Sequence, residues 1–404
     1  MKYDVIIIGG GASGFFTANI LMDQAPDLNV LLLEKSNKLL QKVKISGGGR
    51  CNVTHHEFNP THFSKSYPRG KNLLKKNLRA FGAQDMIEWL NAKGIQTKTE
   101  EDGRMFPVSN NSQSIIDCLL QVTRHKNFTL CKKSGLTNFE IHDDHIEVCT
   151  ASQKFETAKL VLSVGSSQSI WKLLSSKGIK IVKPVPSLFT FTLEDHPLKG
   201  LEGISVPNAH IKVVGTKLQS SGPLLITHKG LSGPCVLRLS AYGARELAEL
   251  KYRFRILINF SGFEAEEDVR EKITELSLSK KQLIKTPQFG ISKRLWERLL
   301  DRSSIDPYKP GRDLNKKEKN KLVAELYQGT YSVKGKNTFK EEFVTAGGID
   351  LSEVERASYS LKKLRDVYAT GEVLNIDGVT GGFNFQGCWT SGWMAANEIL
   401  KGYS

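Results

Sequence analysis

The clearest hydrophobic pattern in the chain is the continuous apolar run Val-Ile-Ile-Ile at residues 5–8. A run of β-branched residues without polar alternation predicts a strand that is buried on both faces. A glycine-rich turn follows, and residues 15–22 then carry apolar side chains at helical spacing. Residues 29–34, Asn-Val-Leu-Leu-Leu-Glu, form a second buried-strand pattern that ends in an acid. This order of strand, turn, helix and strand predicts the start of a parallel α/β sheet.

The glycines of this first turn have the spacing Gly-x-Gly-x-x-Gly, at Gly9, Gly11 and Gly14. Gly9 permits the tight turn, Gly11 lets a pyrophosphate approach the backbone amides, and Gly14 lets the helix and strand pack closely. Glu34, twenty residues beyond Gly14, can accept hydrogen bonds from a ribose diol. We therefore predict dinucleotide binding. The alternative, an ordinary glycine-rich turn, leaves the position of Glu34 unexplained.

The remaining pattern divides the chain into four segments. Residues 1–186 continue the α/β pattern, and from there prolines punctuate β-rich runs, which predicts an antiparallel β domain at 187–261. Residues 262–330 are helical and highly charged, and we expect these charges mostly to solvate a small subdomain. The first pattern returns at 331–404. The fold class that we predict is α/β, a Rossmann-like domain with an inserted antiparallel β domain and a small helical subdomain.

Composition adds that the chain is a soluble globular protein, with 39% apolar and 25% charged residues among 404. The first strand begins almost at once, so we expect no export signal, and no apolar run is long enough to cross a membrane. The six cysteines are scattered and form no Cys-x-x-Cys pair, which argues against a zinc site and a disulfide framework. We expect a cytoplasmic protein with reduced thiols, no bound metal and no membrane contact.

Charge changes the picture, because the net charge of +15 is unevenly placed. Residues 38–80 hold ten basic residues against one acid, Glu57, a net charge of +9. A solvated basic face is one interpretation. A dinucleotide pyrophosphate uses one or two of these cations and not ten, so a polyanionic partner such as RNA is the other interpretation. The candidate RNA contacts are Lys65, Arg69, Lys71, Lys75, Lys76 and Arg79.

Two further glycine loops carry candidate chemistry. In the first, three glycines stand between a possible strand and Arg50-Cys51-Asn52, with Ser46 just before them, which supplies many donors in few residues. The alternative is a plain surface loop. In the second, a strand at 364–372 ends in Gly-Glu, and a glycine loop at 378–385 opens a helix. A strand end, an acid and a helix N-terminus form a second site that favours anions, suited to the far end of a long ligand.

The first and last of these motifs together resemble the glutathione-reductase-type FAD fold. More narrowly, four separated stretches resemble the BaiN/RdsA family of FAD-dependent oxidoreductases, and they follow the family order along nearly the whole chain. They are 45–54 (Ile-Ser-Gly-Gly-Gly-Arg-Cys-Asn-Val-Thr), 227–234 (Thr-His-Lys-Gly-Leu-Ser-Gly-Pro), 345–348 (Thr-Ala-Gly-Gly) and 371–382. The chain departs from the family at Ser163-Val-Gly165, where Ala-Thr-Gly is usual, and residues 166–176 lack the usual glycine cluster.

The resemblance implies FAD as cofactor. The first turn and Glu34 take the ADP half, Glu372 holds the ribityl chain, and Gly381 to Asn384 face the flavin pyrimidine. The cofactor-binding residues that the resemblance implies are Gly9, Gly11, Ala12, Ser13, Gly14, Glu34, Lys35, Lys42, Ser46, Gly49, Arg50, Cys51, Asn52, Leu136, Ser163, Gly165, Gly371, Glu372, Gly381, Gly382, Phe383 and Asn384. The chain has one Gly-x-Gly-x-x-Gly, so NAD(P)H is expected as a transient electron donor, or another protein supplies the electrons.

The family's activities differ between its branches. One branch is understood to reduce uridine in ribosomal RNA to dihydrouridine, and others reduce small molecules, including steroid-like substrates, or oxidise amines. The basic segment 38–80 favours ribosomal RNA as substrate and partner, because a cleft for a small apolar molecule has no use for a +9 stretch. The alternatives are a reductase or oxidase of small apolar metabolites, and a non-enzymatic RNA-binding factor with structural FAD. The sequence leaves the oligomeric state open.

A uracil reduced by hydride transfer also needs a protein acid, and the base must leave its stack to reach the flavin. We expect a cleft between the FAD and β domains to accept it. The candidates for the acid are Cys51 in the glycine loop, His228 in the 227–234 motif and Cys388 one turn into the last helix. For Cys51 a packing role is the alternative, and for His228 a surface turn.

Overall fold

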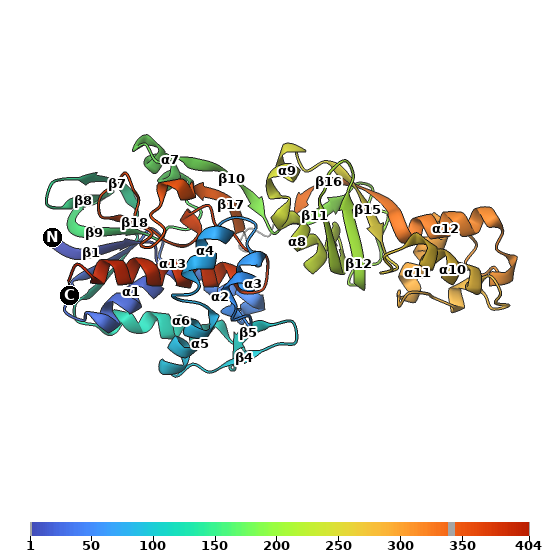
Figure 1. Cartoon of the computed structure of the whole chain (residues 1–404), viewed down its shortest axis with the longest axis horizontal. Coiled ribbons are helices and arrows are strands. Elements are labelled where there is room, and N and C mark those ends of the chain that lie inside the picture. The colour runs from blue at the N-terminus through green and yellow to red at the C-terminus, as the bar shows by residue number, and fades with distance from the viewer. Residues whose placement is uncertain (1, 338–343, 404) are drawn as a thin grey trace. The chain divides into compact units, whose positions relative to one another are not determined.

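The computed structural model describes residues 2–337 and 344–403. The chain divides into two compact units, which we call unit 1 and unit 2. Unit 1 comprises Met1–Val185 with Lys340–Ser404, and unit 2 is the inserted stretch Pro186–Phe339 (Figure 1).

A seven-stranded sheet forms the centre of unit 1. Its strands run in the order β6-β2-β1-β9-β8-β7, and β18 pairs with the carboxyl-terminal part of β9. Strands β6, β2, β1, β9 and β18 are mutually parallel, whereas β7, β8 and the start of β9 form an antiparallel meander. The strands are β1 (Lys2–Ile8), β2 (Val30–Glu34), β6 (Phe128–Lys132), β7 (Leu136–Ile141), β8 (Ile146–Thr150), β9 (Lys154–Leu162) and β18 (Val367–Ala369).

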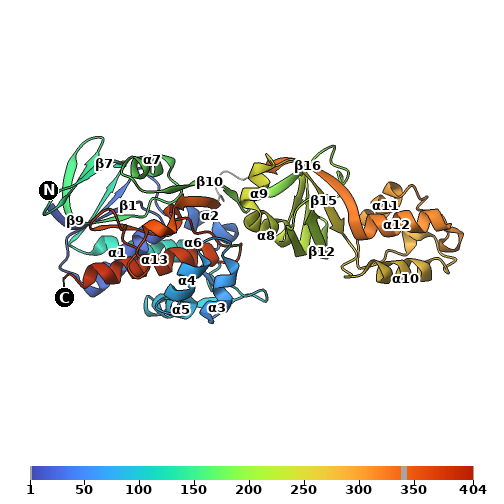
Figure 2. The same ribbon diagram turned by 45° about the horizontal axis from the view of Figure 1, so that its top comes forward.

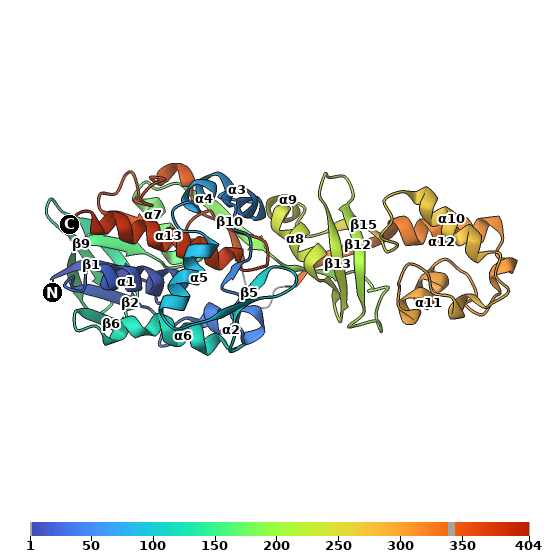
Figure 3. The same ribbon diagram turned by 60° about the horizontal axis from the view of Figure 1, so that its bottom comes forward.

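The parallel strands β1, β2 and β9 are buried where their sequence is an unbroken apolar run, as such a run predicts. Val5 to Ile8, Val30 to Leu33 and Leu160 to Leu162 are each at most 3% exposed. Helix α1 (Ala12–Gln24) packs against the sheet and against α13 (Phe383–Leu400), and Figure 3 shows these two helices side by side. The first and last motifs of the sequence are therefore brought together in one unit.

The other elements of unit 1 are short helices and strands, several of which pack against α1 or α13. They are α2 (Gln41–Gly49), β3 (Thr54–His55), α3 (Pro60–Phe63), η1 (Ser64–Ser66), α4 (Lys71–Asn77), α5 (Ala83–Ala92), β4 (Thr97–Thr99), β5 (Arg104–Pro107), α6 (Ser112–Leu120), η2 (Gln121–Arg124), α7 (Gln168–Ser176), β10 (Ile181–Ser187), β17 (Val344–Ile349), η5 (Leu351–Glu353) and η6 (Gly371–Val373). The expected strand before the glycines of 47–49 is wrong, because that segment is the helix α2. In its Gln-Lys-Val-Lys-Ile sequence only Val43 is buried, so burial does not require a strand. The helix propensity of the glutamine and lysines then favours a helix.

Unit 2 contains a closed barrel, which leaves no open sheet edge. Its strand order is β11-β14-β13-β12-β15-β16, and β16 pairs with β11 to close it. The strands are β11 (Thr190–Leu193), β12 (Ser205–Val213), β13 (Gln219–Thr227), β14 (Gly230–Ser232), β15 (Phe254–Asn259) and β16 (Gly329–Asn337). Helix α8 (Pro234–Tyr242) packs against β13. Helix α9 (Ala244–Glu249) follows it, and Figure 2 shows the two helices near each other.

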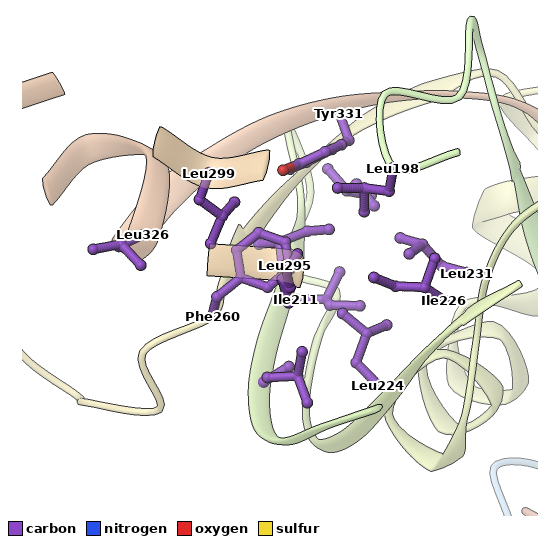
Figure 4. Packing of buried hydrophobic residues seen from close by; sticks show 14 of the residues in the cluster. Leu198, Ile211, Leu224, Ile226, Leu231, Phe260, Leu295, Leu299, Leu326 and Tyr331 are labelled. Carbon is purple, nitrogen blue, oxygen red and sulfur yellow. The ribbon is translucent and has the colours of Figure 1, made fainter. Parts of the chain in front are cut away.

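Residues 262–328 of unit 2 form three helices, which we call the helical module. It contains α10 (Glu266–Leu276), η3 (Leu283–Lys285), α11 (Lys293–Arg302), η4 (Gly311–Asp313) and α12 (Lys316–Gln328). One hydrophobic cluster runs from the barrel interior into this module. In Figure 4, Leu295 and Leu299 of α11 approach Phe260 and Ile211, so barrel and helices share a single core.

The predicted fold class is confirmed, since a Rossmann-like α/β unit receives an inserted antiparallel β structure with helices. Among the described residues, no helix combines the length and the apolar character that crossing a membrane requires.

Candidate cofactor-binding site

The turn after β1 is shaped by its three glycines. Gly9 has a φ of +112°, and a Cβ there would lie 2.4 Å from the carbonyl oxygen of Ser163. A Cβ on Gly14 would lie 2.0 Å from the Gly9 carbonyl, so any side chain would push α1 off the strand. A Cβ on Gly11, in contrast, would meet no described atom within 4 Å. The turn is therefore closed on the sheet side and open above Gly11.

The first turn of α1 presents backbone N–H groups to that open space. Gly11 is the N-cap, and among the described residues no side chain caps the helix. Its first turn carries no acid, so the positive end of the helix dipole is uncompensated. The N–H groups at Ala12 and Ser13 suit an anionic group such as a pyrophosphate.

The Glu34 carboxylate lies at the end of β2 and binds the first turn. It accepts hydrogen bonds from the backbone N–H of Gly10 at 2.7 Å and of Ser36 at 2.8 Å. A carboxylate offers about four lone-pair sites, so it can accept further donors such as a ribose diol. The chain after β6 returns beside Lys35, where a Cβ on Gly135 would lie 3.0 Å from that side chain, and the buried Leu136 follows.

A hydroxyl network joins the ends of three parallel strands. Thr370, after β18, shares hydrogen bonds with Ser13 at 2.8 Å and with Ser163 at 2.7 Å. All three side chains are buried. A Cβ on Gly371 would lie 3.1 Å from Ser13, and one on Gly165 would lie 3.9 Å from the Glu372 carboxylate. The network therefore places the second acid, Glu372, beside the first glycine turn.

Glu372 forms an ion pair with Lys42 of α2, and the Cys388 thiol of α13 lies close by. Partial desolvation disfavours the charge on Lys42, but the Glu372 carboxylate outweighs it and raises the pKa of Lys42 above its ordinary value. Burial, with the negative charge of Glu372, raises the pKa of Cys388 to about 12. Cys388 therefore stays a thiol at neutral pH.

The second glycine loop, 378–382, is held by side chains from distant segments. The Asn384 amide accepts from the Gly378 N–H at 2.8 Å and donates to the Gly378 carbonyl at 3.0 Å. A ring nitrogen of His55 lies 3.0 Å from the Gly381 carbonyl, and the ring stacks on Phe383 at 4.6 Å. Burial lowers the pKa of His55, so it is neutral at pH 7. His55 and Thr370 were missed by sequence reasoning, although His55 directly follows the 45–54 motif.

The loop after α2 is more enclosed than its sequence suggests. Gly47, Gly48, Gly49 and Cys51 all have positive φ, so the chain turns sharply there. Arg50 pairs with Glu100 and lies 3.9 Å from the Phe106 ring centre, while Asn52 accepts a hydrogen bond from the Met105 N–H. Ser46 donates to the Val43 carbonyl at 3.0 Å. Most predicted donors of this loop therefore serve the β3-β5-β4 sheet and α2.

The three candidate acids lie in different environments. Cys51 is 0% exposed, and burial raises its pKa to about 12. Cys388 is partly exposed, and its Sγ lies beside Gly371, where a Cβ would be 3.3 Å from it. His228 belongs to unit 2, in the turn between β13 and β14, and its side chain is 90% exposed. The structure thus brings Cys388, and not Cys51, to the surface of the candidate site.

The predicted RNA contacts divide into two kinds. Arg69 forms a two-pronged ion pair with Asp377, whose side chain is 0% exposed. This pair fixes the 371–382 motif, so Arg69 has a structural role that its sequence did not reveal. The side chains of Lys71, Lys75, Lys76 and Arg79 form no ion pair or hydrogen bond with any described residue, and all except the half-buried Lys75 are exposed. Lys65 is also exposed.

No group of three or more His, Cys, Asp or Glu side chains placed to hold a metal ion occurs within residues 2–337 and 344–403. The donors that the site does present are backbone amides, two carboxylates and hydroxyls. That set matches a long ligand with a pyrophosphate and several hydroxyl groups, as FAD has, so the residues fit the cofactor that the resemblance implied.

Comparison with known proteins supports this assignment. The family described as HI0933-like protein Rossmann domain matches residues 3–398. The ribosomal RNA dihydrouridine synthase of Escherichia coli (strain K12) is 28% identical and covers 100% of this chain and 99% of its own length. The 3-dehydro-bile acid delta(4,6)-reductase of Clostridium scindens is 26% identical over 98% of each chain.

Solved structures show the same fold at much lower identity. The 3-ketosteroid delta1-dehydrogenase of Sterolibacterium denitrificans is 13% identical with a TM-score of 0.51, covering 99% of this chain and all of that one. The 3-ketosteroid-delta4-(5alpha)-dehydrogenase of Rhodococcus jostii RHA1 is 11% identical with a TM-score of 0.52 over 98% and 97%. Because the family match spans almost the entire sequence, the chain belongs to the HI0933-like family, the BaiN/RdsA group of FAD-dependent oxidoreductases.

Proposed function

We propose that the two glycine loops of unit 1 hold the two halves of FAD. The open space above Gly11 and the uncapped start of α1 support a pyrophosphate site there. Glu34 and Glu372 are the acceptors for the ribose and the ribityl chain, and the amides at Gly382 and Phe383 are the donors for the flavin edge. Reduced FAD supplies a hydride to a bound substrate. The remaining steps belong to this chain's side chains, which orient the substrate and deliver a proton.

We further propose that the substrate is a uracil base in ribosomal RNA, which becomes dihydrouracil by gaining hydride at C6 and a proton at C5. The observation that carries this proposal is the row of exposed, unpaired cations on and beside α4, namely Lys71, Lys76 and Arg79. Lysines and arginines without protein partners neutralise phosphates at no cost in internal ion pairs. A small apolar substrate has no negative charges for these cations to bind.

Residues just before α4 contact the loop that we assign to the flavin. The Tyr67 hydroxyl, just before α4, donates to the Phe383 carbonyl at 2.6 Å. Arg69 binds Asp377, and a Cβ on Gly70 would lie 2.7 Å from Ile376. The α4 surface therefore adjoins the loop that we propose for the flavin, and this supports RNA as the substrate.

Cys388 is our first candidate for the proton donor to C5. Its Sγ carries the proton at neutral pH because burial and Glu372 hold its pKa near 12. It is partly exposed, whereas Cys51 has no exposed surface and moves to last place. His228 is the second candidate, on a hairpin turn of unit 2. A pKa of about 12 still permits donation to the strongly basic carbanion that hydride addition leaves at C5.

A second candidate function is the reduction of a small apolar molecule. The observation that favours it is the bile acid reductase among the similar proteins, at 26% identity. This reaction also needs hydride and a proton, so the FAD site does not discriminate between the two substrates. Binding of the substrate by the exposed lysines would distinguish RNA from a small apolar molecule.

The test is nucleoside analysis of ribosomal RNA from cells with and without the gene, followed by reconstitution. We expect dihydrouridine at one position to disappear on deletion and to return with purified protein, NADH or NADPH, and the deleted strain's RNA. Anaerobic addition of each nicotinamide should bleach the flavin absorbance, which identifies the donor. Unchanged dihydrouridine content in the deletion strain would overturn the RNA assignment, and flavin that neither nicotinamide bleaches would point to a protein donor.

A further inference from the structure

The helical module carries a second cationic surface that the cofactor site does not use. Segment 279–285 holds three lysines and no acid, and segment 307–317 holds four basic residues and one acid, a combined net charge of +6. The neighbouring helix α10 holds five acids and two basic residues, a net charge of −3. Segment 279–285 is thus purely basic and α10 is net acidic, while Asp306 and Glu318 flank the 307–317 segment.

The two basic segments lie side by side. The Gly311 N–H donates to the Lys281 carbonyl at 3.0 Å, and the Arg312 N–H donates to the Ser279 carbonyl at 2.8 Å. The Leu283 N–H donates to the Lys309 carbonyl at 3.0 Å. These bonds pair the segments in antiparallel fashion, so cations thirty residues apart in sequence share one surface.

The first turn of α12 joins the same surface. The Lys309 ammonium binds the Glu318 carboxylate at 2.7 Å, within that turn. Lys316 and Lys317 precede Glu318 and are exposed. Cations at a helix start are unfavourable to the helix dipole, so folding gains nothing from their position.

Five lysines of this surface have no internal partner. Within the described chain, the side chains of Lys280, Lys281, Lys285, Lys316 and Lys317 form no ion pair or hydrogen bond, and all five are exposed. On α10, by comparison, Arg270 pairs with Glu266 and Lys272 pairs with Glu275. On α10 the charges of both signs are mixed and ion-paired, as is typical of a surface whose charges only keep the protein soluble. Exposed lysines without an ion pair to a described residue also occur on the barrel, so what sets these five apart is that the paired segments gather them on one surface.

The surface also exposes an aromatic ring. Tyr308 is 60% exposed, and it lies in the 307–317 segment beside Ile284, whose N–H donates to the Pro307 carbonyl at 2.8 Å. An exposed aromatic side chain among cations provides a stacking platform for an unpaired base. Phosphate contacts and one base platform together suit a single-stranded or looped RNA.

We propose that Lys280, Lys281, Lys285, Tyr308, Lys316 and Lys317, the module surface, form a second RNA contact that binds backbone and one unpaired base away from the reacting uracil. This inference rests on the proposed RNA substrate and adds a separate binding site to it. The module shares its core with the barrel, so the surface is rigidly carried by unit 2. The sequence pattern predicted that these charges only solvate the module, whereas we propose that they bind RNA.

The test measures RNA binding by the FAD-loaded full chain across a salt series, using a ribosomal RNA fragment that contains the reduced site. The variant Lys280→Gln/Lys281→Gln/Lys285→Gln should flatten the slope of log K against log salt by about two to three units. A matched control on the barrel, Lys212→Gln/Lys217→Gln/Lys251→Gln, removes three exposed lysines of the same unit and should keep the wild-type slope. Tyr308→Ala should weaken binding roughly tenfold, and Tyr308→Phe should restore it.

Flavin content and thermal melting should match wild type in all four variants, because every altered side chain is exposed. A wild-type slope in the Lys280/Lys281/Lys285 variant, while neutralising Lys71, Lys75 and Lys76 flattens it, would overturn the module surface and leave the RNA substrate intact. Equal losses in the variant and the barrel control would show a general charge effect and also overturn it. No RNA binding by wild type would refute the proposed function itself.

Discussion

At the scale of single residues, the site depends on acids that already hold polar groups of the protein. Glu34 binds two backbone N–H groups, and Glu372 binds Lys42. Each acid therefore has a defined position before any cofactor arrives. Such preorganisation reduces the ordering cost of binding, so both acids should contribute strongly to cofactor affinity.

We predict that Glu34→Ala and Glu372→Ala each lower FAD affinity by roughly one to two decades, because a hydrogen bond to a charged acceptor contributes about 1.5–3 kcal/mol. Titration of apoprotein with FAD, followed by flavin fluorescence, gives the dissociation constants. Glu88→Ala, at an exposed position on α5, is the control and should bind FAD normally. Full flavin occupancy in both site variants would show that the acids do not bind the cofactor.

We also predict that the pKa of the Cys388 thiol, and therefore its rate of alkylation, depends on Glu372 and Lys42, which can be tested without a substrate. Its pKa of about 12 leaves almost no thiolate at pH 8. Glu372→Gln removes a negative charge that raises this pKa, so the pKa falls and alkylation of the apoprotein by iodoacetamide accelerates. Lys42→Met removes a cation that lowers the pKa and should slow alkylation. Peptide mapping by mass spectrometry separates Cys388 from the other five cysteines, and equal rates in all three proteins would contradict the assignment.

Residue types predicted part of this site and could not predict the rest. The glycines and the terminal acids were predictable because their roles are local. The glycines allow neighbouring backbone to approach closely, and the acids are hydrogen-bond acceptors at strand ends. His55, Thr370 and Asp377 act through partners about 300 residues away, and no local pattern reports such a contact. Arg50 and Asn52 were predicted as ligand donors; in the structure Arg50 pairs with Glu100 and Asn52 accepts from the Met105 N–H, and their contacts to a cofactor stay a prediction.

At the scale of elements, α4 separates two classes of cation that look alike in the sequence. Arg69, just before the helix, compensates a buried carboxylate, whereas Lys71, Lys75 and Lys76 have no partner in the described chain. Sequence reasoning grouped them because charge counts ignore burial. Regular elements were easier to predict, since unbroken apolar runs identified β1 and β2 directly. Helix α2 was missed because its single buried residue leaves no periodic pattern.

We predict that Lys71→Gln/Lys75→Gln/Lys76→Gln flattens the salt dependence of RNA binding by about two to three units, with unchanged unfolding free energy. Arg69→Ala should instead destabilise unit 1 by about 3–5 kcal/mol, because it removes the guanidinium that compensates the buried Asp377. Urea unfolding monitored by tryptophan fluorescence measures the second effect. A stable Arg69→Ala protein with reduced RNA binding would mean that Arg69 is a phosphate ligand after all.

At the scale of the whole molecule, the sequence pattern predicted the α/β unit more completely than the barrel unit. The α/β unit is built from local strand–helix repeats, which periodicity reports. The barrel closes through β11 and β16, which lie about 140 residues apart, and its core continues into helices that the sequence separated from it. Closure and shared packing are long-range properties, so alternating patterns alone predicted only an antiparallel sheet.

Cations cluster in residues 65–79 of unit 1, which hold six basic residues and no acid, and on the module surface of unit 2. Two sites on one chain bind a long RNA with an effective local concentration that a short RNA cannot exploit. The salt dependence of binding should therefore rise in a step with RNA length. Fragments too short to reach both sites should lose slope in one triple variant only.

We predict that a full-length ribosomal RNA domain loses slope in both triple variants, and that combining the six substitutions flattens it by about four to five units. The losses should add, because the two sets of lysines lie in separate compact units and share no partner in the described chain. Binding of nested RNA fragments across a salt series measures the step, and flavin absorbance checks that each protein is loaded. If the six-substitution variant loses no more slope than either triple variant, only one surface contacts a given RNA at a time. A slope that does not change with fragment length would lead to the same conclusion, and the two units would then not act on one RNA together.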